Sequence, residues 1–167
     1  MDPNLSFDFS INKEDRRILV KREFAATLPL VWDAWTKAEI LDQWWAPKPW
    51  KSETKSMEFK EGGTRLYAMV GPQGERHWAI FRFDRIEPQK YFSGLTGFSD
   101  AEGVINSQMP VAPWEVSFTD KGNTTLVETL ITFDSLEDME VLMQTGFKEG
   151  FTIALQGLED ILPTLRP

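Results

Sequence analysis

The chain contains no cysteine and only one histidine among its 167 residues. Without thiols it can form neither disulfide bonds nor thiolate zinc sites, and it has no cysteine nucleophile. The single histidine, His77, cannot build a multi-histidine metal site. A lone histidine beside a turn is usually a surface residue, so we expect no catalytic role for it. We therefore expect neither a metal nor a metal-dependent activity.

Long apolar runs and excess positive charge are also lacking. No stretch approaches the ~20 apolar residues that span a bilayer, and the first residues show no basic region followed by an apolar one. We therefore expect no membrane span, no secretory signal and a cytoplasmic location. The net charge is −8, and residues 134–162 hold seven acidic side chains against one lysine. Such a surface repels phosphate backbones, so we expect no nucleic-acid partner.

Cofactor-binding motifs are missing as well. The sequence has no glycine-rich phosphate loop, serine nucleophile elbow or dinucleotide fingerprint, and Gly62 and Gly63 lack the strand-then-helix context of such loops. We predict no cofactor. The carboxylates Asp33, Glu39 and Asp42 are best explained as the solvated face of short helices.

Tryptophan is concentrated in one segment. Residues 30–47 hold four of the seven tryptophans. Thr27 can cap a helix that has Pro29 in its first turn, where a missing N–H costs nothing. A second short helix is predicted from Ala38 to about Trp44, and Pro47 ends it.

Short strand-like runs separated by turns make up the middle of the chain. Residues 1–17 are polar and aperiodic and are predicted to be an arm, and residues 18–24 form the first strand. A possible strand within 51–60 and a loop over 99–112 complete the pattern, which is typical of an antiparallel meander. The clearest later strands are 64–70, 77–86, 90–97, 113–119 and 124–133.

The last predicted element is one helix over residues 136–162, capped by Ser135. Its apolar positions recur every three or four residues, as a helix face requires. These positions are Leu136, Met139, Met143, Phe147, Phe151, Leu155, Leu158 and Leu162. A second stripe of small residues consists of Gly146, Gly150, Ala154 and Gly157. This stripe indicates either close approach to the sheet or to a second copy, or a cavity beneath the helix.

The length fits one domain of residues 18–162, with the arm before it and a tail over 163–167. Within that range a set of ordered motifs resembles a known family. They are PLVWDAWTKAEILDQWWAP (29–47), FKEGGT (59–64), MVGPQG (69–74), IEP (86–88), WEVSFTDKGNTT (114–125), GFKEGF (146–151) and LEDIL (158–162). The chain is thereby similar to bacterial domains like the activator of heat-shock-protein ATPase homologue, a branch of the SRPBCC (START/Bet v 1-like) superfamily.

The resemblance implies an α+β helix-grip fold. In this fold a curved antiparallel sheet wraps around a long C-terminal helix, and two short helices follow strand 1. A pocket between sheet and helix is implied, with the short helices at its mouth. Relatives include binders of apolar molecules, polyketide cyclases and cochaperone domains, so the fold leaves the function open.

Aromatic residues exceed what a compact core needs, which favours an internal apolar pocket for a flat, unidentified ligand. The predicted lining residues are Trp44, Trp45, Tyr67, Trp78, Phe81, Phe83, Phe92, Trp114, Phe118, Phe147 and Phe151. Two alternatives remain. The first is a cyclase or aromatase using Tyr67, Arg82, His77 or a buried carboxylate. The second is a module that binds a chaperone. Strand alternation turns Arg82 toward solvent, and a one-residue bulge would turn it inward. Both a monomer and a homodimer are compatible with the sequence.

Overall fold

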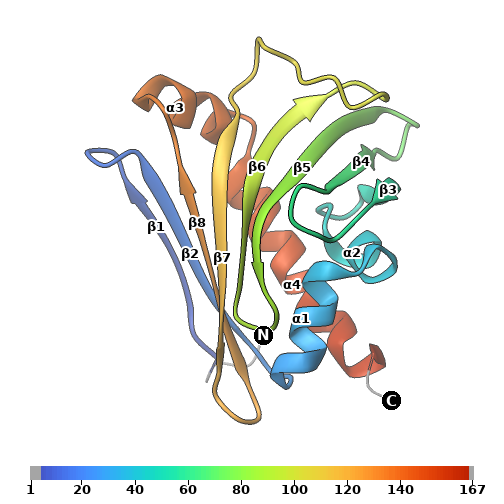
Figure 1. Ribbon diagram of the computed structural model, residues 1–167, viewed down its shortest axis with the longest axis vertical. Coiled ribbons are helices and arrows are strands. Elements are labelled where there is room, and N and C mark those ends of the chain that lie inside the picture. The colour runs from blue at the N-terminus through green and yellow to red at the C-terminus, as the bar shows by residue number, and fades with distance from the viewer. Residues whose placement is uncertain (1–4, 166–167) are drawn as a thin grey trace.

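The computed structural model describes residues 5–165 and is built on one curved antiparallel sheet of eight strands. The strand order is β1-β2-β8-β7-β6-β5-β4-β3. Helix α4 lies along the concave side, with α1 and α2 beside it near the β3–β4 end (Figure 1). The strands are β1 (Phe7–Asn12), β2 (Arg17–Phe24), β3 (Lys51–Met57), β4 (Thr64–Val70), β5 (Arg76–Glu87), β6 (Tyr91–Ser99), β7 (Ala112–Asp120) and β8 (Thr125–Thr132). The helices are α1 (Leu28–Thr36), α2 (Ala38–Trp44), α3 (Leu136–Gln144) and α4 (Phe147–Leu165). This is the predicted helix-grip arrangement.

Strand alternation places the core on the concave side. In β2 the residues Ile18, Val20, Arg22 and Phe24 are all buried, while their neighbours are half-buried or exposed. The same period-two pattern recurs in β7 and β8, as expected for strands with one face covered by a helix. Within the described part of the chain, no helix combines the length and apolar character needed to cross a membrane.

The N-terminal segment differs from the predicted aperiodic arm. Residues Phe7–Asn12 form an edge strand that pairs antiparallel with β2, from Phe7 opposite Arg22 to Asn12 opposite Arg17. Phe7 and Phe9 pack against the core from this strand. The alternation of phenylalanine with polar residues is short, and sheet pairing supplies what the local sequence lacks. The two short helices consequently follow the second strand rather than the first.

The predicted single helix over residues 136–162 is wrong in one respect: it is two helices. Ser135 caps α3, because its Oγ accepts a hydrogen bond from the Asp138 N–H at 3.1 Å. Helix α3 ends at Gln144, and Gly146 in the turn that follows has φ +84° and donates its N–H to the Met143 carbonyl. Such a left-handed glycine is a common helix C-terminus, and the local periodicity did not reveal it. Helix α4 also continues through Pro163 into the predicted tail.

The small residues of α4 allow close packing against α2 and the turn after it. A Cβ at Gly150 would lie 3.5 Å from Pro47 Cγ, and one at Gly157 would lie 3.9 Å from Trp44 Cβ. The stripe therefore faces α2 and the turn after it, whereas the sequence predicted the sheet, a second copy or a cavity. Gly146 belongs to the break between the helices.

The convex side of the sheet is covered locally by the predicted loop, which joins β6 to β7. A Cβ at Gly103 would lie 3.5 Å from Ile80 and 3.8 Å from Leu66, so the loop packs over β4 and β5. Trp78 is half-buried and shares the face of Ile80 by alternation. The ammonium of Lys55 lies 5.8 Å from the centroid of the Trp78 ring.

Candidate functional site

A small apolar cavity lies on the concave side, between α2 and strands β4 to β7. Its volume is about 20 Å³. A cavity of that size holds about one water molecule, whereas ligand pockets measure roughly 300–1,000 Å³. The ligand-sized hollow that the sequence predicts is therefore not open in this structure, because aromatic rings fill the space. The lining residues are Trp35, Leu41, Trp45, Arg65, Tyr67, Phe81, Phe83, Phe92, Trp114 and Val116.

Six of the predicted aromatic residues line the cavity and five do not. Those that line it are Trp45, Tyr67, Phe81, Phe83, Phe92 and Trp114. Trp44 is buried behind them, and its indole N–H donates to the Ala34 carbonyl at 2.9 Å. Phe118 packs on Trp32, with ring centroids 5.0 Å apart. Trp78 lies on the convex side of the sheet.

The other two predicted residues, Phe147 and Phe151, lie one turn apart at the start of α4. Their rings stack with centroids 5.3 Å apart. Phe151 also contacts Trp45 and Trp114, with centroids 6.0 and 5.8 Å away, so it supports the rings that line the cavity. These two residues form a second aromatic layer behind the cavity wall.

Sequence reasoning missed four lining residues: Trp35, Leu41, Arg65 and Val116. For Arg65 a signal existed, because strand alternation places it on the same face as Tyr67, which was predicted to point inward. Arg82 is exposed. The irregularity in β5 lies between Phe83 and Ile86, after Arg82, and so leaves its outward orientation unchanged.

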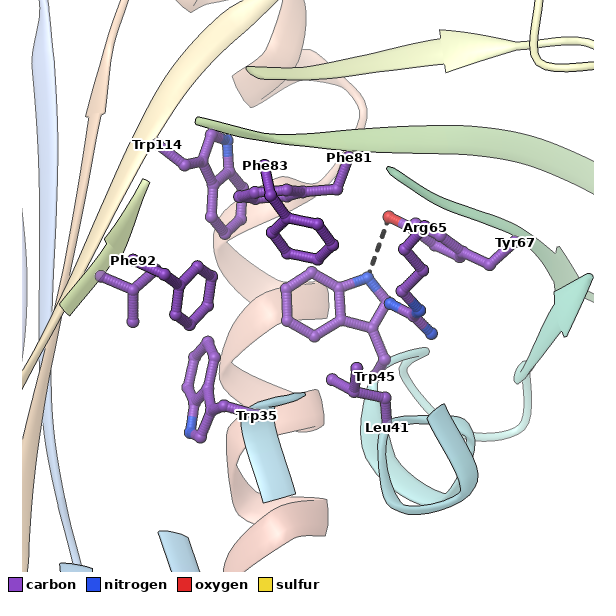
Figure 2. A pocket seen from close by; sticks show the side chains of 10 residues that line it. Trp35, Leu41, Trp45, Arg65, Tyr67, Phe81, Phe83, Phe92 and Trp114 are labelled. Atoms are coloured by element: carbon purple, nitrogen blue, oxygen red, sulfur yellow. Dashed lines mark hydrogen bonds between the residues drawn. The ribbon is translucent and has the colours of Figure 1, made fainter. Parts of the chain in front are cut away.

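Trp45 closes the cavity. Among the lining residues it is the one that is half-buried, and the others are all buried. Its ring lies among those of Trp35, Tyr67 and Trp114, with centroids 6.0, 6.4 and 5.9 Å away (Figure 2). Its Nε1–H donates to the Tyr67 hydroxyl at 3.0 Å. Trp45 thus separates the interior aromatic cluster from solvent.

A polar cluster forms the wall beside Tyr67. Arg65 is buried, and its Nη2 donates to Ser52 Oγ at 2.8 Å and to Asp42 Oδ1 at 3.3 Å. Its Nε donates to Thr54 Oγ1 at 3.2 Å. Asp42 also accepts hydrogen bonds from Ser52 and Thr54. Far from being a merely solvated residue, Asp42 ties α2 to β3 and orients Arg65.

Burial controls the protonation of both ionisable lining residues. It raises the pKa of Tyr67, an effect that the nearby Arg65 opposes, so this phenol stays protonated at neutral pH. Burial likewise lowers the pKa of Arg65, against the opposing charge of Asp42. Arginine starts so high that it remains a cation. The cavity therefore carries one positive charge and one neutral hydroxyl.

Metal and histidine chemistry find no support at this site. Across residues 5–165 no group of three or more histidine and carboxylate side chains could hold a metal ion. His77 is exposed at the start of β5, with its ring 5.3 Å from that of Trp50. The site is thus an aromatic enclosure with one polar wall.

Several solved protein structures share this fold. A protein from Arthrobacter aurescens is 27% identical, with a TM-score of 0.89 over 94% of this chain and 91% of its own. A Mycobacterium smegmatis protein shares the fold at 23% identity, with a TM-score of 0.86 over 95% and 96%. An AHSA1 protein from Silicibacter pomeroyi shares it at 17% identity, with a TM-score of 0.70 over 90% and 99%.

No match was found among curated proteins. The sequence pattern of one family matches residues 25–163, which include the tryptophan-rich helices, the sheet from β3 onward and both C-terminal helices. The chain therefore belongs to the family described as Activator of Hsp90 ATPase homolog 1-like protein.

Proposed function

We propose that the protein binds a small, flat aromatic molecule that enters the helix-grip interior by taking the place of the Trp45 side chain. The observation that carries this proposal is the position of that side chain. The Trp45 indole is a bicyclic ring with one polar edge atom, and it lies among several other aromatic rings. Its N–H donates a hydrogen bond to the buried Tyr67 hydroxyl. A ligand of similar shape could use the same contacts.

Displacement of Trp45 is physically reasonable because the ring contacts that hold it are ones that a ligand of similar shape would make in its place. Trp45 lies at the C-terminal cap of α2 and is followed by a turn that contains Pro47 and Pro49. Its indole makes one neutral hydrogen bond, worth about 1 kcal/mol net. A bound aromatic ring would recover the buried area that Trp45 gives up, so only the ordering of the ligand opposes the exchange. The small volume of the closed cavity is then expected.

Binding is favoured over the cyclase or aromatase alternative by the composition of the wall. General acid–base catalysis needs a group that accepts a proton from the substrate. The lining residues include no carboxylate or imidazole, Arg65 is a cation, and Tyr67 is a neutral donor. Asp42 stands behind Arg65 and is already engaged by Ser52 and Thr54. This wall can orient a polar group but has no base to offer it.

The test is a titration of the ¹⁵N-labelled protein with 2-naphthol, followed through the tryptophan indole N–H signals. We expect the Trp45 signal to shift saturably and further than that of Trp50, which is half-buried nearby but does not line the cavity. The variant Trp50→Phe should bind 2-naphthol like the wild type. If no indole signal moves up to the solubility limit of the probe, and the melting temperature is unchanged, the proposal fails.

A second function, binding to a chaperone ATPase, is favoured by the family and by the nearly filled interior. The matched family is described by its likeness to an Hsp90 activator, and the acidic α3–α4 surface exposes Leu136 and Ile153 at 39% and 47%. Calorimetric titration of the protein into Hsp90 tests this function. Heat of binding that Ile153→Asp abolishes would support it, whereas no heat at micromolar concentrations would set it aside.

A further inference from the structure

The polar wall of the cavity has more hydrogen-bond donors than acceptors. In the described part of the chain, the hydrogen bonds of Arg65 are donated by Nε and Nη2, so both hydrogens of Nη1 remain available. The Tyr67 hydroxyl accepts from Trp45, so its own proton also remains available. The buried side-chain atoms without a partner among the described residues are Arg22 Nε and Trp35 Nε1, so Arg65 Nη1 is not fully buried. Its free hydrogens and that of Tyr67 can bind a ligand that accepts hydrogen bonds.

The charge of the wall is also incompletely balanced on the cavity side. The Arg65 side chain is 4% exposed, whereas that of Asp42 is 30% exposed. Asp42 accepts three hydrogen bonds of 2.7–3.0 Å from Ser52 and Thr54, and its contact with Arg65 is longer, at 3.3 Å. The negative charge is thus shared among other donors and faces water. The positive charge lies in the interior, where it is less screened.

The two available donors, on Arg65 and Tyr67, lie close together. The Arg65 guanidinium stacks on the Tyr67 ring with its Cζ 4.0 Å from the centroid, and it lies 5.7 Å from the centroid of the Trp45 ring (Figure 2). Departure of Trp45 would free the Tyr67 hydroxyl beside the guanidinium. A group entering there would meet both donors at once.

We propose that the molecule bound in this interior is an aromatic carboxylate, whose carboxylate accepts hydrogen bonds from Arg65 Nη1 and the Tyr67 hydroxyl while its ring replaces Trp45. This inference rests on the proposed function and names the class of its ligand. A charged acceptor forms the stronger hydrogen bonds with a guanidinium, and it would supply the countercharge that Asp42 only partly provides.

The experiment compares three probes with the same ring system: 2-naphthoate, the neutral ketone 2-acetonaphthone, and naphthalene. Dissociation constants are measured near neutral pH by indole N–H shifts. We expect wild-type protein to bind 2-naphthoate at least about 10-fold more tightly than 2-acetonaphthone, as charge-assisted hydrogen bonds allow. Arg65→Met should abolish that preference, so that 2-naphthoate binds no more tightly than 2-acetonaphthone.

Two further variants keep the test decisive. Tyr67→Phe retains the ring and should weaken 2-naphthoate binding about 3- to 10-fold, as loss of one hydrogen bond predicts, even if Arg65→Met does not fold. Arg22→Met removes a buried arginine that does not line the cavity and should leave the preference intact.

Each outcome separates this inference from the proposed function. Binding of naphthalene and 2-acetonaphthone without a preference for 2-naphthoate overturns the carboxylate alone. A wild-type preference that survives both Arg65→Met and Tyr67→Phe also overturns it, because the anion would then bind elsewhere. Failure of all three probes overturns the proposed function together with this inference.

Discussion

Two buried arginines on the concave face, Arg65 in β4 and Arg22 in β2, lie in very different surroundings. Arg65 borders the cavity and is held by three polar side chains. Arg22 is 2% exposed, and its Cζ lies 5.5 Å from the ring centroids of both Phe7 and Phe24. Arg65 thus belongs to a polar wall, whereas Arg22 lies beside two phenylalanine rings, an arrangement called the aromatic sandwich below.

The packing around these arginines differs as well. At the β2 end, Gln156 accepts a hydrogen bond from Arg22 Nη2 at 3.2 Å, and Arg22 Nε has no partner among the described residues. No cavity residue lies there. Leu158 of α4 is a fully buried core residue that does not line the cavity. The β4 end instead keeps a void and a half-buried tryptophan. Stability is therefore expected to depend on the β2 end, and binding on the β4 end.

The largest expected effect on stability comes from shortening a buried side chain, and it should be larger away from the cavity than in the cavity lining. Leu158→Ala should lower the free energy of unfolding by about 4 kcal/mol, because the surrounding side chains cannot fill the space. Leu41→Ala at the cavity should cost less, about 3 kcal/mol, because Trp45 can move toward the gap. Urea denaturation measures both values. An equal or larger loss for Leu41→Ala would contradict the distinction between a packed end and an adaptable end.

A middle-sized effect separates the arginines themselves. Arg65→Met should destabilise the protein by about 2 kcal/mol, because it removes the hydrogen bonds that Arg65 donates to Asp42, Ser52 and Thr54, while water and the remaining donors still reach Asp42. Arg22→Met should change stability by less than about 1 kcal/mol, since it also removes a buried cation with an unpaired N–H. Thermal and urea unfolding of both variants provide the comparison. Greater loss in Arg22→Met would show that the aromatic sandwich, not the polar cluster, anchors the sheet.

The smallest effect concerns pH and the hydroxyl at the β4 end. Burial raises the pKa of Tyr67 above its ordinary value near 10, so below about pH 10 the folded and unfolded states are both protonated at this group. As the pH rises further, the unfolded state loses the proton first, and stability falls by up to about 1.4 kcal/mol per pH unit. Tyr67→Phe should reduce this slope, which urea denaturation between about pH 9 and pH 11 can measure. Tyr91, the other tyrosine, is present in both proteins and cancels in the comparison.

Strand alternation explains which features of the cavity the sequence predicted. Local alternation predicted the strands that carry the cavity, and in β5 it placed Phe81 and Phe83 on the inner face. It equally placed Trp78 with Ile80 on the outer face, where Gly103 of the β6–β7 loop packs beside Ile80. Trp78 was predicted to line the pocket because it is aromatic, although its position in the strand places it on the outer face.

Boundaries set by a single backbone conformation were harder to predict. The apolar stripe from Leu136 to Leu162 steps evenly across Gly146, so periodicity gave no sign of the break that its φ of +84° produces. The β1 strand was missed for a related reason. A short edge strand is stabilised by pairing with its neighbour, which no local pattern reveals.

The amino-acid sequence was enough to predict the antiparallel sheet, the short tryptophan-rich helices, the C-terminal helix face and the family, because these depend on periodic patterns and ordered motifs. Three-dimensional packing was needed to see that the aromatic residues fill the interior rather than enclose a ligand-sized space. The same packing brings Arg65, Tyr67 and Trp45 together at one wall. Packing depends on how side chains from α2, β4 and α4 fit together, and distances between such segments are not encoded in any local pattern.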